Sequence, residues 1–142
     1  MDFNFGLFGA AAALGISAIG SAIGLAIAGQ GTVGAWKRCY LNNKPAPFLI
    51  VAFAGAPLTQ TIYGFLLMNA MVASARDPWF LLGVGVVCGL AIAASAVAQG
   101  KAGACGSDAY CETGKGFSQY ITVVGLCETV ALFVMVFGLI SV

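Results

Sequence analysis

The chain has 142 residues and a formal net charge of +1, and 61% of its residues are hydrophobic while 8% are charged. An average soluble domain has roughly 25% charged residues, so this composition argues against an ordinary soluble enzyme and favours a membrane protein. Apolar stretches fill nearly the whole of residues 1–142, which predicts a single all-α membrane domain with no soluble catalytic part.

Four of these stretches reach the length of about 20 residues that a helix needs to cross a bilayer. Short polar segments separate them, and the third of these connections is predicted to run from Gly106 to Gly116. The helices are therefore expected to form two hairpins, residues 1–76 and residues 77–142. The four predicted helices are Phe5 to Trp36, Pro47 to Ala75, Trp79 to Ala104, and Phe117 to Val142.

Small residues recur at every fourth position on the first and third predicted helices. In lipid, such faces let helix backbones approach closely and favour association through van der Waals packing. Such small-residue faces are compatible with helix packing inside one subunit. Because two of only four helices carry them, however, we favour a role as the inner wall of a ring of identical subunits. The positions are Gly20, Gly24 and Ala28, with Ala13, Ser17 and Ser21 beside them, and Gly85, Gly89 and Ala93.

The second predicted helix carries Thr59, Gln60 and Tyr63 on one face, because residues three and four apart on a helix lie side by side. Pro57 lacks an N–H group and is expected to disturb the backbone hydrogen bonding just before this cluster, which would free a local carbonyl. The third predicted helix adds Gln99, the one long uncharged polar side chain in its second half.

The fourth predicted helix contains Glu128, the only acidic residue deep within an apolar stretch. A charge at the centre of a membrane helix costs about 2.5 to 3.5 kcal/mol, so a proton or a coordinated cation must neutralise this carboxylate. A proton needs only the carboxyl group and one acceptor. The surplus of hydroxyl, amide and phenol oxygens therefore favours a hard cation, and the single carboxylate favours a monovalent one.

The two hairpins are related in sequence, which suggests duplication of an ancestral hairpin. The alignment places Ser21 and Gln60 of the first hairpin at the positions of Gln99 and Glu128 in the second, so only the second hairpin retains the acid. The matched segments are Ser17 to Ala22 with Ser95 to Gly100, and Thr59 to Thr61 with Cys127 to Thr129.

Basic residues are distributed unevenly among the connections. The second connection holds only Arg76, and the other basic residues lie in or beside the first and third connections. The positive-inside rule therefore predicts a multi-pass protein with both hairpin loops in the cytoplasm and the termini, with Asp2, on the opposite side. The residues at the loops are Lys37, Arg38, Lys44, Lys101 and Lys115.

Over essentially its whole length, the chain resembles the rotor-ring proteolipid, or c/K subunit, of V-type and A/V-type rotary ATPases. Three segments carry the resemblance: Pro57 to Phe65, Ala98 to Lys101, and Cys127 to Thr129. The resemblance implies a non-catalytic subunit that joins identical copies in a ring. The ring would turn against a stator and carry ions, while a separate soluble sector handles ATP.

The resemblance also implies Na⁺ as the bound ion, with no organic cofactor. Lithium is an expected competitor, and H⁺ is the alternative coupling ion, because proton-translocating members keep the glutamate but lack the full set of ligands. The phenol that matches Tyr63 steadies the glutamate in the family. The implied ligands are Thr59, Gln60, Gln99 and Glu128, with the backbone carbonyl of Ala56 as a further candidate.

The implied partners are identical subunits, a stator subunit of the a/I type with a membrane arginine, central-stalk subunits at the cytoplasmic loops, and lipid, but no nucleic acid. A rival interpretation is a small four-helix exporter of cationic drugs, which would need a roomy aromatic pocket where the first helix offers Gly and Ala. A purely structural proteolipid is a second rival, and it predicts that Glu128→Gln leaves ion transport untouched.

Overall fold

The computed structural model describes residues 3–142. Asp2, which was predicted to lie on the side of the membrane opposite the loops, is outside the described residues. Within the described part the chain forms four apolar helical spans long enough to cross a membrane, as predicted. The second span is divided into three short elements and one longer helix. In chain order the elements are α1 (Phe5–Leu41), η1 (Phe48–Ile50), α2 (Val51–Gly55), η2 (Ala56–Leu58), α3 (Thr59–Ala73), α4 (Pro78–Thr113) and α5 (Phe117–Ser141).

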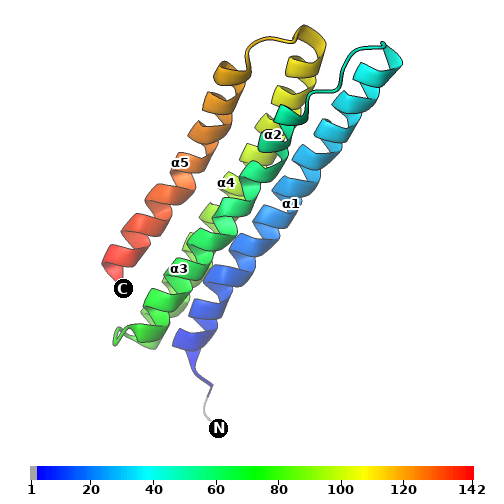
Figure 1. Cartoon of the computed structure of the whole chain (residues 1–142). Coiled ribbons are helices and arrows are strands. Elements are labelled where there is room, and N and C mark those ends of the chain that lie inside the picture. The colour runs from blue at the N-terminus through cyan, green and yellow to red at the C-terminus, as the bar shows by residue number, and fades with distance from the viewer. Residues whose placement is uncertain (1–2) are drawn as a thin grey trace.

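The helices lie side by side in a bundle of two hairpins (Figure 1). The connection after α1 and the connection between α4 and α5 lie at one end, and the connection between α3 and α4 lies at the other end with both chain ends (Figure 1). The first helix of each hairpin, α1 or α4, therefore runs parallel to its counterpart. This arrangement places α1 against α4 at the centre, with α3 and α5 packed on them.

Glycine makes the central contact between α1 and α4 possible. A side chain on Gly24 would overlap the Ala96 carbonyl of α4, and a side chain on Gly100 would overlap the Gly24 carbonyl of α1. Gly20 faces Ala93 in the same way. The predicted small-residue faces thus serve close backbone packing inside the subunit. This is one of the two roles considered from the sequence, the other being the inner wall of a ring.

Two helices extend beyond their predicted ends. α1 continues to Leu41 instead of Trp36, and α4 continues to Thr113 instead of Ala104, so the segment from Gly106 that was expected to be a loop is largely helical. The prediction was wrong because it treated polar residues as helix breakers. Their polar groups are satisfied between the two helices, since the Thr32 and Ser107 hydroxyls share a buried hydrogen bond of 2.8 Å.

Local signals explain where several helices begin and end. The Asp77 carboxylate accepts hydrogen bonds from the backbone N–H groups of Trp79 and Phe80 and so caps the start of α4. Gly114, at a φ of 67°, ends this helix in the left-handed conformation that glycine adopts most easily. α3 ends at Ala73, two residues before the predicted boundary.

The second span is irregular where the sequence predicted a disturbance. Pro57 lies in η2, a short 3₁₀ turn over Ala56–Leu58, and α3 begins directly after it at Thr59. Proline cannot donate a backbone hydrogen bond, so the regular α-helical ladder is interrupted at this point. The interruption lies immediately before the polar face of α3.

Candidate ion-binding site

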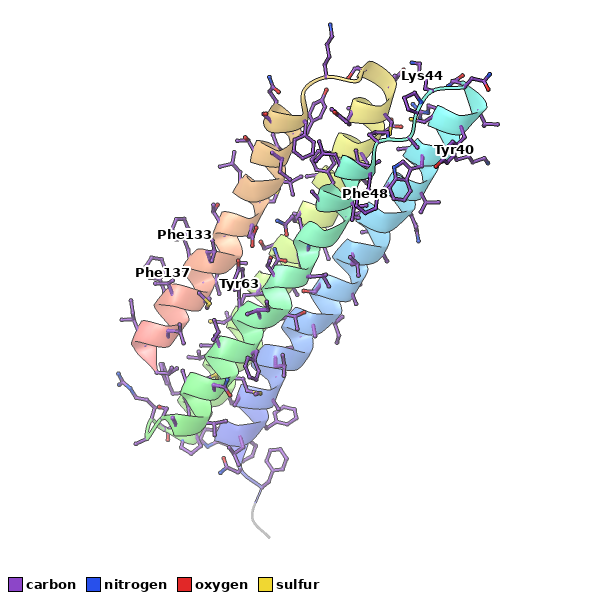
Figure 2. The ribbon with its side chains drawn as sticks, viewed as in Figure 1. Tyr40, Lys44, Phe48, Tyr63, Phe133 and Phe137 are labelled. Carbon is purple, nitrogen blue, oxygen red and sulfur yellow. The ribbon has the colours of Figure 1, made fainter. Side chains whose placement is uncertain are left out.

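Glu128 lies half-buried on α5, where side chains from two other helices contact its carboxylate. The Tyr63 hydroxyl of α3 donates a hydrogen bond of 2.5 Å to Glu128 Oε1. Gln99 Nε2 of α4 donates a hydrogen bond of 3.2 Å to Glu128 Oε2. Figure 2 shows Tyr63 between α3 and α5. Each carboxylate oxygen therefore has one donor, and the two donors come from different hairpins.

Two fully buried amides lie behind the carboxylate. Gln60 Nε2 of α3 donates a hydrogen bond of 2.6 Å to Gln99 Oε1 of α4. Gln99 Nε2 also donates to the backbone carbonyl of Val124 on α5, at 3.1 Å. Both side chains are 0% exposed. Because a buried amide is costly when its groups have no partners, these contacts fix where the two side chains lie.

Thr59 and Ala56 extend the network toward the irregular turn at Pro57. The Thr59 hydroxyl lies 3.0 Å from the Ala56 carbonyl and 3.3 Å from Gln60 Oε1, and its single hydrogen can be donated to either oxygen. All six residues proposed from the sequence thus belong to one connected group, drawn from α3, α4, α5 and the η2 turn. Their oxygens include one carboxylate, two amides, one hydroxyl, one phenol and one backbone carbonyl.

Ser95 contributes to the site although the sequence reasoning did not include it among the site residues. Its hydroxyl on α4 donates a hydrogen bond of 2.6 Å to the backbone carbonyl of Cys127, the residue before Glu128. Ser95 and Gln99 are four residues apart, so both project from one face of α4 and both bind carbonyls of α5. The spacing of four from Gln99 was the signal available in the sequence.

No basic side chain neutralises Glu128 within the described residues. The ion pairs of the structure join Arg38 to Asp108 and Glu112, near the connection between α4 and α5. The described residues also contain no group of three or more His, Cys, Asp and Glu side chains that could hold a metal ion. The site therefore combines one acid with uncharged oxygens, a set that suits a proton or a hard monovalent cation better than a transition metal.

Comparisons with known proteins relate the chain to subunits of ATP synthases. The family model for the C subunit of ATP synthase matches residues 82–141, which include Ser95, Gln99 and Glu128. The A-type ATP synthase subunit K of Methanocaldococcus jannaschii is 33% identical over 131 residues, which cover 90% of this chain and 57% of the relative. The chain thus spans little more than half the length of that relative. With its four apolar spans, the chain is a multi-pass membrane protein whose sequence is similar to the C subunit of ATP synthase and to an A-type ATP synthase subunit K.

Proposed function

We propose that this chain is a rotor-ring subunit of an A/V-type ATPase or ATP synthase and that it carries Na⁺ at Glu128. The observation on which the proposal rests is the group of oxygens from Ala56, Thr59, Gln60 and Gln99 that hydrogen bonds connect to an acid, Glu128, which no basic side chain within the described residues neutralises. The relative from Methanocaldococcus jannaschii, an A-type ATP synthase protein by name, supports the rotary role. The chain itself would catalyse no reaction.

The proposed mechanism follows from the electrostatics of Glu128. When Na⁺ or a proton neutralises the carboxylate, the site can face lipid at little cost. When the site is empty, the negative charge is tolerated only beside a positive group or water, which the stator arginine and its half-channels would supply. Rotation between these environments therefore couples ion binding and release to movement of the ring.

The outer helices carry the apolar surface that a ring in a membrane requires. Phe133 and Phe137 stack on each other along α5, with ring centroids 6.2 Å apart, and both are exposed. Figure 2 shows these two side chains directed away from the other helices. Such a surface favours contact with lipid or with a neighbouring subunit.

The loop end offers basic residues for the stalk, but they are not equivalent. Arg38 is paired with Asp108 at 2.7 Å, whereas Lys37 is exposed and has no ion pair within the described residues. Lys37 is therefore the better candidate for contact with central-stalk subunits. We place these loops in the cytoplasm, with both hairpins in one membrane domain, because basic residues gather at this end.

One observation favours H⁺ as the coupling ion. The Gln60 amide binds Gln99 Oε1 directly at 2.6 Å, so the side-chain network closes without a cation between the two amides. A carboxyl group that is neutralised by a proton would leave this contact unchanged. Binding of Na⁺ by both amide oxygens would instead weaken this contact, because the cation would repel the Gln60 N–H group directed at Gln99 Oε1.

Labelling of Glu128 with a carbodiimide, which reacts with the protonated carboxyl group, separates these possibilities in the assembled complex. The reaction is followed at constant pH while sodium is varied, and Glu128→Gln serves as the unlabelled control. We expect sodium to slow the labelling and lithium to do so more weakly. If labelling is independent of sodium, the ion is H⁺ and the sodium proposal is wrong.

A further inference from the structure

Ser21 on α1 has a buried hydroxyl with no hydrogen-bond partner within the described residues. The side chain is 2% exposed, and its Oγ is the one buried side-chain nitrogen or oxygen atom of the described chain that lacks a partner. Ser17, one turn earlier on the same helix, instead donates to the Ala13 carbonyl at 2.7 Å. An unpaired buried hydroxyl is unfavourable, so this position calls for an explanation.

The register of the first hairpin places Ser21 opposite Gln60. α1 runs antiparallel to the second span (Figure 1), and two contacts fix how the helices align. Gly64 packs against Ser17, and Gly24 packs against Pro57. Ser21 lies four residues after Ser17, as Gln60 lies four residues before Gly64, so these two buried residues occupy the same level between the two contacts.

The second hairpin supports this pairing. The sequence alignment matches Ser21 with Gln99 and Gln60 with Glu128, and Gln99 and Glu128 are in direct contact through a hydrogen bond of 3.2 Å. In the first hairpin both members of the pair are uncharged, and serine is shorter than glutamine. The pair is therefore preserved in position, while the direct hydrogen bond is not formed in this structure.

The amide group of Gln60 needs such a partner when a cation binds. In the structure Gln60 Nε2 donates one hydrogen to Gln99 Oε1, the oxygen that would ligate the ion. A cation bound to Gln99 Oε1 would repel the Gln60 N–H group directed at the same oxygen and weaken this hydrogen bond, so we expect the amide to turn and to direct an N–H group elsewhere. On the side of α1, Ser21 Oγ is a buried side-chain oxygen with no partner within the described residues, so it is free to accept a hydrogen bond.

We infer that Ser21 is a positioning residue of the ion site, whose hydroxyl accepts a hydrogen bond from the Gln60 amide in the cation-loaded state. The hydroxyl holds the amide with its oxygen directed toward the ion and its nitrogen toward α1. This inference rests on the proposed sodium function. It extends the site to the first helix, which contributes no ligand in the proposal above.

The test compares Ser21→Ala with Ser17→Ala in the assembled complex. Carbodiimide labelling of Glu128 is measured over a range of sodium concentrations at constant pH. We expect Ser21→Ala to raise the sodium concentration for half-protection roughly tenfold, as for a lost buried hydrogen bond, and Ser17→Ala to leave it unchanged. The labelling rate without sodium should be the same in both variants and in the unmodified protein.

The rate without sodium distinguishes a role in ion binding from a role in folding. A purely structural hydroxyl would change assembly or labelling at every sodium concentration, and this result would overturn the inference. If sodium protects the unmodified protein and Ser21→Ala equally, Ser21 has no role in binding although the proposed function stands. If sodium protects neither protein, the sodium function and this inference both fail.

Discussion

Tyr63 and Glu128 belong to different hairpins, yet the Tyr63 hydroxyl donates a hydrogen bond of 2.5 Å to the Glu128 carboxylate. Hydrogen bonds to charged groups are stronger than those between neutral groups. The first hairpin, which has no intramembrane acid of its own, therefore orients the acid of the second. This contact joins α3 to α5 at the level of the buried amides Gln60 and Gln99.

Removal of this hydroxyl should weaken ion binding without unfolding the protein. Tyr63→Phe removes one hydrogen bond to a charged group, which contributes about 1.5 to 3 kcal/mol. We expect sodium to protect Glu128 from carbodiimide roughly ten- to a hundredfold less effectively. Tyr40→Phe is the matched control, because Tyr40 is exposed near the end of α1. An unchanged sodium midpoint in Tyr63→Phe would show that the hydroxyl does not steady Glu128.

Gln99 should be the most sensitive uncharged residue of the site, because it contacts Gln60, Glu128 and the Val124 carbonyl. Gln99→Leu keeps a similar volume but leaves the Gln60 amide and a carboxylate oxygen without their partner. We expect loss of sodium protection and a stability loss of about 1 to 3 kcal/mol. Gln119→Leu, at an exposed position of α5, should change neither property in labelling and thermal unfolding measurements.

Close packing between α1 and α4 predicts opposite effects for two glycine substitutions. Gly100→Ala would place a methyl group on the Gly24 carbonyl and should destabilise the protein by about 1 to 3 kcal/mol. Gly29→Ala meets no atom within 4 Å and should be neutral or stabilising by up to about 1 kcal/mol, because alanine favours the helix. Thermal unfolding in detergent, followed by circular dichroism, tests both. Equal stability of the two variants would contradict the close contact.

The ion pair between Arg38 and Asp108 joins the ends of α1 and α4 and should contribute little to stability. Both side chains are about half exposed, so Arg38→Ala should cost less than about 1 kcal/mol. Arg38→Glu should cost more, because the new carboxylate would lie beside Asp108 and Glu112, and added salt should reduce this cost. Lys37→Glu is the control, because Lys37 forms no ion pair within the described residues. A double variant that also carries Asp108→Arg should recover stability in the same unfolding measurement.

The ends of the helices show where sequence reasoning failed. Polar residues after Ala104 were expected to form a loop, but α4 continues to Thr113 because Ser107 and Asp108 find partners on α1. A count of apolar residues measures how a segment interacts with lipid. It contains no information about hydrogen-bond partners on a distant helix. Ser107, for example, finds its partner in Thr32 of α1, more than 70 residues earlier in the chain.

The sequence by itself determined the four spans and the single intramembrane acid, because hydrocarbon excludes unpaired charge and requires long apolar helices. The periodicity of α3 also identified Thr59, Gln60 and Tyr63 as one polar face. Only the tertiary structure decided which of these groups contact Glu128 and placed Ser95 against the Cys127 carbonyl beside it. Such contacts depend on how helices are rotated and aligned, and close approach at glycine sets that alignment through contacts between residues distant in sequence.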